Sequence, residues 1–221
     1  MKIPEYLDEK EQDLLLAQTK KNGTVLQRRN HVIIDLILKT GLRCSECLDI
    51  KRKDIDWVDG KIKVVQGKGG KDRILWVGES TLKSIADYLE IMDEYLLKKG
   101  VTPGCSNVFL TSKGWSIDSS YLRSTFARYG KQAGIEKRVH PHMLRHTFAT
   151  YFYRKHKDLR MLQKALGHEN LSCVQIYTHI IDEEFEQSMK DYEVKDKDDE
   201  VTHQMKGKKS YVTRKILFKK P

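Results

Sequence analysis

Apolar residues recur along most of the chain at three- and four-residue intervals, the spacing of one buried face of an α-helix. This pattern predicts helices near 8–19, 24–40, 44–50, 79–99, 118–133, 142–155, 158–166, 171–177 and 182–191. One stretch differs, because 61–66 and 72–77 are typical of strands separated by a glycine turn, inside a sheet at about 54–77. The sequence therefore predicts an α+β fold, mainly α with a small three-stranded antiparallel sheet.

Arg43 follows the predicted end of a helix. Gly41 is typical of the residue that stops a helix, and Ser45-Glu46 of the first turn of the next one. An anion beside Arg43 would therefore also lie near a helix N-terminus, whose unpaired N–H groups favour negative charge. We interpret Glu46 as a partner that fixes Arg43 or a neighbouring histidine, not as an acid in the chemistry.

A second basic group lies on one predicted helix. His142 and Arg145 are three residues apart and so project from one face. Leu144, Phe148 and Tyr151 repeat at helical spacing on another face and are most simply core. We expect the helix to pack with one side and to offer His142 and Arg145 to a ligand with the other.

Lys68 lies in a glycine turn, Gly-Lys-Gly-Gly-Lys at 67–71, between the two predicted strands. A nucleotide-binding phosphate loop does not fit, because Val65 stands where a glycine is needed and Asp72 where Ser or Thr is needed. We therefore expect no nucleotide cofactor.

A metal site is also not expected. Cys44 and Cys47 form a C-x-x-C and His142 and His146 are four apart, but there is no second C-x-x-C. The histidine pair also lacks the glutamate that a zinc-protease helix carries directly after its first histidine. The cysteines are better explained as small, reduced residues flanking Arg43.

The net charge of +10 favours a polyanionic partner, although a ribosomal or membrane-surface protein would carry similar charge. Four cysteines without a disulfide framework and the lack of an export signal predict a cytoplasmic protein. The most apolar run, 32–38, is short and contains Asp35, so we expect no membrane span.

Tyr177 is the candidate nucleophile among the basic residues described above. A tyrosine hydroxyl has a pKa of about 10 and becomes a usable nucleophile only beside several positive charges. Five short motifs occur in one order: Thr40-Gly41-Leu42-Arg43 with Ser45-Glu46, Gly67-Lys68-Gly69, His142-x-Leu144-Arg145-His146, Leu166-Gly167-His168 and Ile176-Tyr177. In order and approximate spacing they resemble the catalytic boxes of the tyrosine recombinase (phage integrase) family, over roughly residues 3–190.

The resemblance implies the fold of the tyrosine recombinase catalytic domain and a reaction at DNA phosphates. Tyr177 would attack the scissile phosphate, form a 3′-phosphotyrosyl bond and release a 5′-hydroxyl, without metal or nucleotide. Arg43 and Arg145 would hold the non-bridging oxygens, where negative charge accumulates in the transition state.

The resemblance also assigns the proton transfers. Lys68 would protonate the departing 5′ oxygen, with Lys71 three residues away as the alternative. His142 and His168 would act as proton acceptor or hydrogen-bond donor to the phosphate, His142 being the expected partner of the tyrosyl proton. His146 is expected to be a supporting, structural residue.

Expected DNA contacts lie on two segments. The helix at 118–133 resembles the family helix that enters the major groove, which makes Ser119, Ser120 and Arg123 candidates to read bases; a solvated helix face is the alternative. Lys71 and Arg73 on the hairpin are further predicted DNA contacts.

Both ends depart from the family pattern. Most members carry an N-terminal core-binding domain that closes on the opposite face of the duplex, and we expect that domain to be absent here, in a fragment or in a minimal natural form. Residues 1–194 would form the catalytic domain. Residues 195–221 would form a basic tail, since 201–221 carries seven basic and no acidic residues; it either partly replaces the missing domain or is disordered.

The expected function is therefore a site-specific recombinase acting on double-stranded DNA, as a tetramer on two duplexes. Two alternatives stay open. A type IB topoisomerase would use the same groups as a monomer and rejoin the original strand, and a non-catalytic DNA-binding module would have kept the fold without turnover.

Overall fold

The computed structural model describes most of the chain in two units, residues 1–182 and 183–221. The described residues are 4–21, 23–65, 72–167, 177, 186, 189, 190 and 192. In the second unit, residues 186, 189, 190 and 192 are helical, and Lys190 pairs with Glu186 at 2.6 Å.

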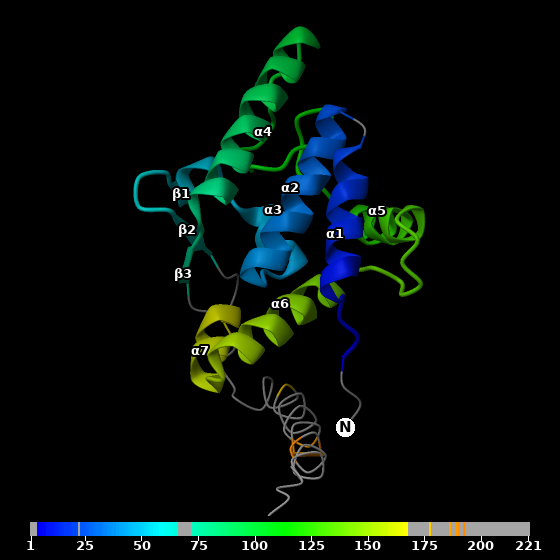
Figure 1. The fold of residues 1–221 in the computed structure, drawn as a ribbon. Helices are drawn as coiled ribbons and strands as arrows, with labels where there is room; N and C mark the ends of the chain where they lie inside the picture. Colours follow the sequence, from blue (N-terminus) through cyan, green and yellow to red (C-terminus); the bar gives the residue numbers. More distant parts are fainter. Residues whose placement is uncertain are drawn as a thin grey trace, which may run out of the picture. The chain divides into compact units, whose positions relative to one another are not determined.

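The described part of the first unit is mainly helical (Figure 1). Its elements are α1 (Glu9–Lys20), α2 (Val25–Thr40), α3 (Cys44–Asp49), η1 (Arg52–Asp54), β1 (Ile55–Asp56), β2 (Lys61–Val64), β3 (Arg73–Trp76), α4 (Glu79–Lys98), α5 (Ser119–Gln132), α6 (Pro141–His156) and α7 (Leu159–Leu166). The predicted bounds of these α-helices hold to within one residue, and the predicted fold class is confirmed. The helix predicted at 171–177 falls almost wholly outside the described residues.

The sheet has the strand order β1-β2-β3, with both pairs antiparallel. Side chains alternate along β2, where Ile62 and Val64 are buried, and Ile62 lies opposite buried Leu75 of β3. The β2–β3 connection at 66–71, with Lys68 and Lys71, lies outside the described residues.

Helix α2 forms the centre of the core. It packs against α1, α4 and α6, and Figure 1 shows it between α1 and α4 with α6 crossing near its C-terminal end. Ile33, Ile34, Leu36 and Ile37 are fully buried, as expected for a helix covered on nearly every side. Within the described residues, no helix is long and apolar enough to cross a membrane.

A buried polar network fixes α5 to α2. The guanidinium of Arg29 donates to the carbonyl of Leu110 at 2.7 Å and to the hydroxyl of Tyr121 at 3.3 Å. Asn30 donates to the hydroxyl of Tyr129 at 3.2 Å. Because buried polar groups without partners are costly, these bonds set where α5 lies, and with it Ser119 at the helix start.

Candidate active site

Three arginines surround the carboxylate of Glu46 on α3. The carboxylate accepts from the backbone N–H of Arg43 at 2.8 Å and from its Nη1 at 2.7 Å. Arg73 of β3 donates from Nη1 at 3.0 Å and from Nη2 at 2.8 Å, while Nη1 of Arg145 lies 3.8 Å from Oε2. Three guanidinium groups around one carboxylate leave a surplus of positive charge.

Glu46 keeps its charge although only 8% of it is exposed. Burial raises the pKa of the carboxyl, but hydrogen bonds from Arg73 and Arg43 outweigh burial and bring the pKa to about 2. At neutral pH the carboxylate is therefore an anchor that holds the guanidinium groups and accepts no proton.

Arg145 on α6 is 6% exposed and thus far less accessible than His142, together with which the sequence predicted it to be offered to a ligand. Its Nη1 donates to the carbonyl of Gly41 at 2.6 Å and its Nη2 to that of Leu166 at 2.9 Å. Those carbonyls stand at the C-terminal ends of α2 and α7, where they have no partner within their helices. Burial, and secondly Arg43, lowers the pKa of Arg145 to about 10, which still leaves it charged at neutral pH.

Gly41 allows this close approach. It has φ +66° in the left-handed region, as predicted for a helix end, and its N–H donates to the carbonyl of Ile37 at 2.8 Å. A Cβ here would lie 2.3 Å from Cδ1 of Phe148 on α6. Only glycine therefore lets the α2–α3 link pack against α6 and place Arg43 and Arg145 beside the same carboxylate.

A cleft of about 590 Å³ opens beside this arginine cluster. Its lining includes four of the residues predicted to act in catalysis or DNA binding: Arg43, Ser119, Arg123 and His142. Arg43 is the exposed member of the cluster, with 39% of its side chain accessible. The cleft thus gathers cations and hydrogen-bond donors from the α2–α3 link, α5 and α6, an arrangement suited to phosphate oxygens.

Sequence reasoning missed Arg138 and His140 of the cleft, and also the acidic Glu5, which lines it as well. His140 is the N-cap of α6, and its Nδ1 accepts from the backbone N–H of Met143 at 3.2 Å. Burial, followed by the charge of His142, lowers the pKa of His140. Pro141 was the overlooked signal, because proline favours the first position of a helix and so marks residue 140 as the cap.

Tyr177 is only 3% exposed. It packs in a small apolar cluster of α6 and α7 whose other buried members are Ala149, Tyr153, Leu162 and Leu166. Burial raises the pKa of Tyr177 to about 12, against the opposing effect of Arg145. The phenol is therefore protonated at neutral pH.

The hydroxyl of Tyr177 lies 2.6 Å from Nδ1 of His146. Burial, with His142 and Arg145 next, lowers the pKa of His146 to about 4, so the imidazole is neutral, and in the tautomer with its proton on Nε2 the Nδ1 accepts from the phenol. The sequence assigned the tyrosyl proton to His142 and a structural part to His146. In the structure His146 is bonded to the phenol, and His142 lines the cleft.

The remaining predicted residues have varied surroundings. Arg73, predicted as a DNA contact, is 11% exposed in its side chain and is engaged with Glu46. Ser120 does not line the cleft, and its hydroxyl donates to Asp118, the N-cap of α5. Lys68, Lys71 and His168 lie outside the described residues.

Cys44 and Cys47 are free thiols. Burial raises the pKa of Cys44 to about 11 and that of Cys47 well above its usual value, so both are protonated at neutral pH. Among the residues that the structure describes, no group of three or more His, Cys, Asp or Glu side chains is placed to hold a metal ion.

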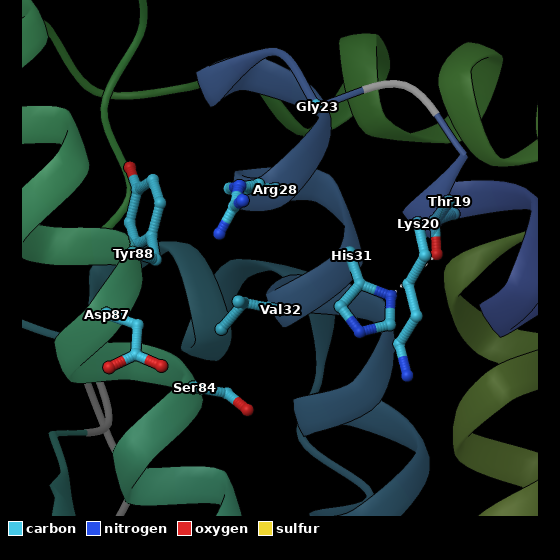
Figure 2. A pocket seen from close by; sticks show the side chains of 9 residues that line it. All are labelled: Thr19, Lys20, Gly23, Arg28, His31, Val32, Ser84, Asp87 and Tyr88. Carbon is cyan, nitrogen blue, oxygen red and sulfur yellow. Dashed lines mark hydrogen bonds between the residues drawn. The ribbon is translucent and has the colours of Figure 1, made fainter.

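A separate pocket of about 290 Å³ lies between the α1–α2 region and α4 (Figure 2). Lys20, Arg28, His31 and Asp87 line it, and none of them belongs to the predicted site. His31 is held by the hydroxyl of Thr19, 2.7 Å from its Nδ1. Asp87 pairs with Lys83. The hydroxyl of Tyr88, which also lines the pocket, accepts from the backbone N–H of Leu110 at 3.3 Å.

Comparison with known sequences identifies the family. A profile of the phage integrase family matches residues 5–184. Tyrosine recombinase XerC of Halalkalibacterium halodurans is 38% identical over 182 residues, which cover 81% of this chain and 59% of that protein. Tyrosine recombinase XerD of Staphylococcus haemolyticus is 36% identical over 182 residues, with the same coverage of 81% and 59%. The chain thus spans about three fifths of the curated relatives that it matches.

Solved structures agree with this assignment. The crystal structure of XerA recombinase superposes with a TM-score of 0.72 at 32% identity, covering 87% of this chain and 66% of that one. The crystal structure of XerH recombinase bound to a palindromic difH substrate superposes with a TM-score of 0.71 at 30% identity. The match covers 87% of this chain and 54% of that one. The catalytic domain of bacteriophage HP1 integrase shares the fold, with a TM-score of 0.56 at 21% identity. The match covers 79% of this chain and 87% of that one. The chain belongs to the phage integrase family and has the fold of a tyrosine recombinase catalytic domain.

Proposed function

We propose that this protein cleaves and rejoins DNA strands at specific sites through a 3′-phosphotyrosyl intermediate. The observation that carries the proposal is the cluster of Arg43, Arg73 and Arg145 around Glu46, beside a cleft lined by His142. Tyr177 lies against the same helix, bonded to the residue that follows Arg145. The proposed nucleophile and the cations come from distant parts of the chain.

The arginine cluster suits the charge of the transition state. A phosphodiester gains negative charge on its non-bridging oxygens when a fifth oxygen attacks, and preformed cations stabilise that charge. Arg43 faces the cleft, while Glu46 and backbone carbonyls fix the guanidinium groups in advance. Little rearrangement of these groups is then needed during the reaction.

In the proposed step, the phenolic oxygen of Tyr177 bonds to phosphorus as the bond from phosphorus to the 5′ oxygen breaks. The phenolic proton passes to a histidine, and Lys68 or Lys71 protonates the 5′ oxygen. Because the phosphotyrosyl ester is itself a diester, a 5′-hydroxyl can reverse the step without a nucleotide. His142 and His168 keep their proposed contacts to the phosphate.

Double-stranded DNA is the proposed partner. XerH at 30% identity has been solved on a palindromic difH substrate after cleavage. The cleft of this chain adds Arg123 and Arg138 to Arg43, three guanidinium groups that fit a phosphate backbone. Action as a tetramer on two duplexes, and a cytoplasmic location, stay predictions from the sequence.

A pool of nicked duplexes with randomised sites tests the proposal. The nick lets the short 5′-hydroxyl fragment diffuse away, so a covalent protein–DNA adduct accumulates. We expect adduct with the native chain and none with Tyr177→Phe. Tyr88→Phe is the matched control, since Tyr88 is equally buried but lies on α4 and donates no group to the cleft. Adduct in Tyr177→Phe, or none with the native chain, would refute the proposal.

The two alternatives need one further measurement. Adduct offered a labelled duplex with a free 5′-hydroxyl should join it if the protein is a recombinase. Relaxation of supercoils without joining to a new duplex would indicate a type IB topoisomerase. Binding without adduct would indicate a non-catalytic module.

A further inference from the structure

The two histidines at one end of α6 have different surroundings. His142 is exposed and lines the cleft beside Arg43. His146, one turn later, is half-buried, and its Nδ1 lies 2.6 Å from the hydroxyl of Tyr177. Their rings therefore serve different neighbours, although both belong to the same short motif.

The surroundings of Tyr177 hold it in place. Its ring packs among Ala149, Leu162 and Leu166, and the ring of His146 lies 6.1 Å away at 45°. Within this apolar cluster, the bond to His146 gives the hydroxyl a partner in place of water. An unpaired hydroxyl would be costly there, so the bond and the burial support each other.

Arg145 cannot follow Tyr177 in a movement without losing its own contacts. Its guanidinium is bonded to the carbonyls of Gly41 and Leu166, which fix it between α2 and α7. The guanidinium of Arg145 is thus built into the core, whereas the hydroxyl of Tyr177 is bonded to His146 and its ring lies in an apolar cluster. Fewer described polar contacts would therefore have to break for Tyr177 to change place than for Arg145.

We propose that His146 is a positioning residue for the nucleophile, holding the hydroxyl of Tyr177 within the α6–α7 cluster, so that this bond must break before the phenol can reach a phosphate in the cleft. This inference rests on the proposed function for its last step. Its first step, the bond itself, concerns the protein without DNA and is measured independently of cleavage.

Tyrosine labelled with ¹³C at Cζ reports the hydrogen bond directly. The chain has ten tyrosines, and the resonance of Tyr177 is the one lost in Tyr177→Phe. His146→Leu removes the acceptor and keeps apolar bulk, whereas the amide oxygen of His146→Asn can take the place of Nδ1. His31→Leu is the matched control, because Nδ1 of His31 also lies 2.7 Å from a hydroxyl, that of Thr19 (Figure 2).

In the DNA-free protein, the Tyr177 resonance should move in His146→Leu and stay near its native position in His146→Asn and His31→Leu. The other nine tyrosine resonances show whether each variant keeps its fold. On a nicked duplex, His146→Leu should form the covalent adduct about fivefold faster, the factor that corresponds to one net hydrogen bond.

A Tyr177 resonance that does not move in His146→Leu would overturn the proposal. So would a slower reaction in that variant, because it would make His146 an aid to the attack and not a restraint on it. If the resonance moves as expected and the native chain forms no adduct, the proposed function fails while the bond between His146 and Tyr177 stands.

Discussion

Arg73 and Glu46 are 27 positions apart in the sequence and form a two-pronged ion pair, with nitrogen–oxygen distances of 3.0 and 2.8 Å. The pair joins β3 to α3. It also leaves Glu46 shared among three guanidinium groups, because Arg43 bonds the same carboxylate and Arg145 lies 3.8 Å from it. One carboxylate therefore organises the positive charge of the candidate site.

Glu46→Gln should lower the free energy of unfolding at pH 7 by about 3 kcal/mol, because it leaves buried guanidinium groups without their counter-charge. Urea unfolding followed by circular dichroism measures the change. Glu94→Gln is the control, since Glu94 pairs with Lys98 on the exposed face of α4, and its loss should change stability far less. Equal losses of unfolding free energy in the two variants would contradict the conclusion that Glu46 holds the arginine cluster.

Lowering the pH should remove the contribution of Glu46 to the free energy of unfolding over a defined pH range. The pKa of this carboxyl is about 2 in the folded protein and 4.5 in the reference state. A lowered pKa means that the stabilisation is complete above pH 4.5 and is lost as the pH falls toward 2. The stability gap between the native chain and Glu46→Gln should therefore be constant from pH 7 to 5 and shrink between pH 4.5 and 2. A gap that stays constant down to pH 2 would show that the pKa is not lowered.

Arg145→Lys should slow adduct formation by about 100-fold or more while DNA affinity changes little, since preformed donors act mainly on the transition state. Lysine keeps the charge but cannot bond the carbonyls of Gly41 and Leu166 in the same planar geometry. Single-turnover cleavage at saturating DNA separates rate from binding. A variant that loses affinity and keeps its rate would assign Arg145 to binding alone.

Arg123→Ala should have the opposite profile. Arg123 lines the cleft from α5 and is not part of the cluster around Glu46. If Arg123 contacts a phosphate, its loss should weaken DNA binding and reduce by about 1 the slope of the logarithm of the binding constant against the logarithm of the salt concentration. The rate of adduct formation at saturating DNA should change little. Arg128→Ala, on the same helix but outside the cleft lining, is the control and should leave the slope unchanged.

Much of the fold follows from local pattern. Helical periodicity and Gly41 predicted the α-helices and the α2–α3 link, because those signals come from residues close together in the chain. The burial of Arg145 did not follow, since its partners at Gly41 and Leu166 lie 104 and 21 positions away. The bond between His146 and Tyr177 joins residues 31 positions apart, a separation over which helical periodicity gives no information.

Substitutions of His140 distinguish a capping function from DNA binding. Its Nδ1 caps α6, and the residue also lines the cleft, so its loss should affect both stability and binding. His140→Ala should lower the free energy of unfolding by about 1 kcal/mol, whereas His140→Asn, a good N-cap, should stay close to native. Both variants should bind DNA more weakly, because both remove the imidazole from the cleft. Chemical unfolding and DNA titration measure the two effects, and full affinity in His140→Asn would restrict His140 to capping the helix.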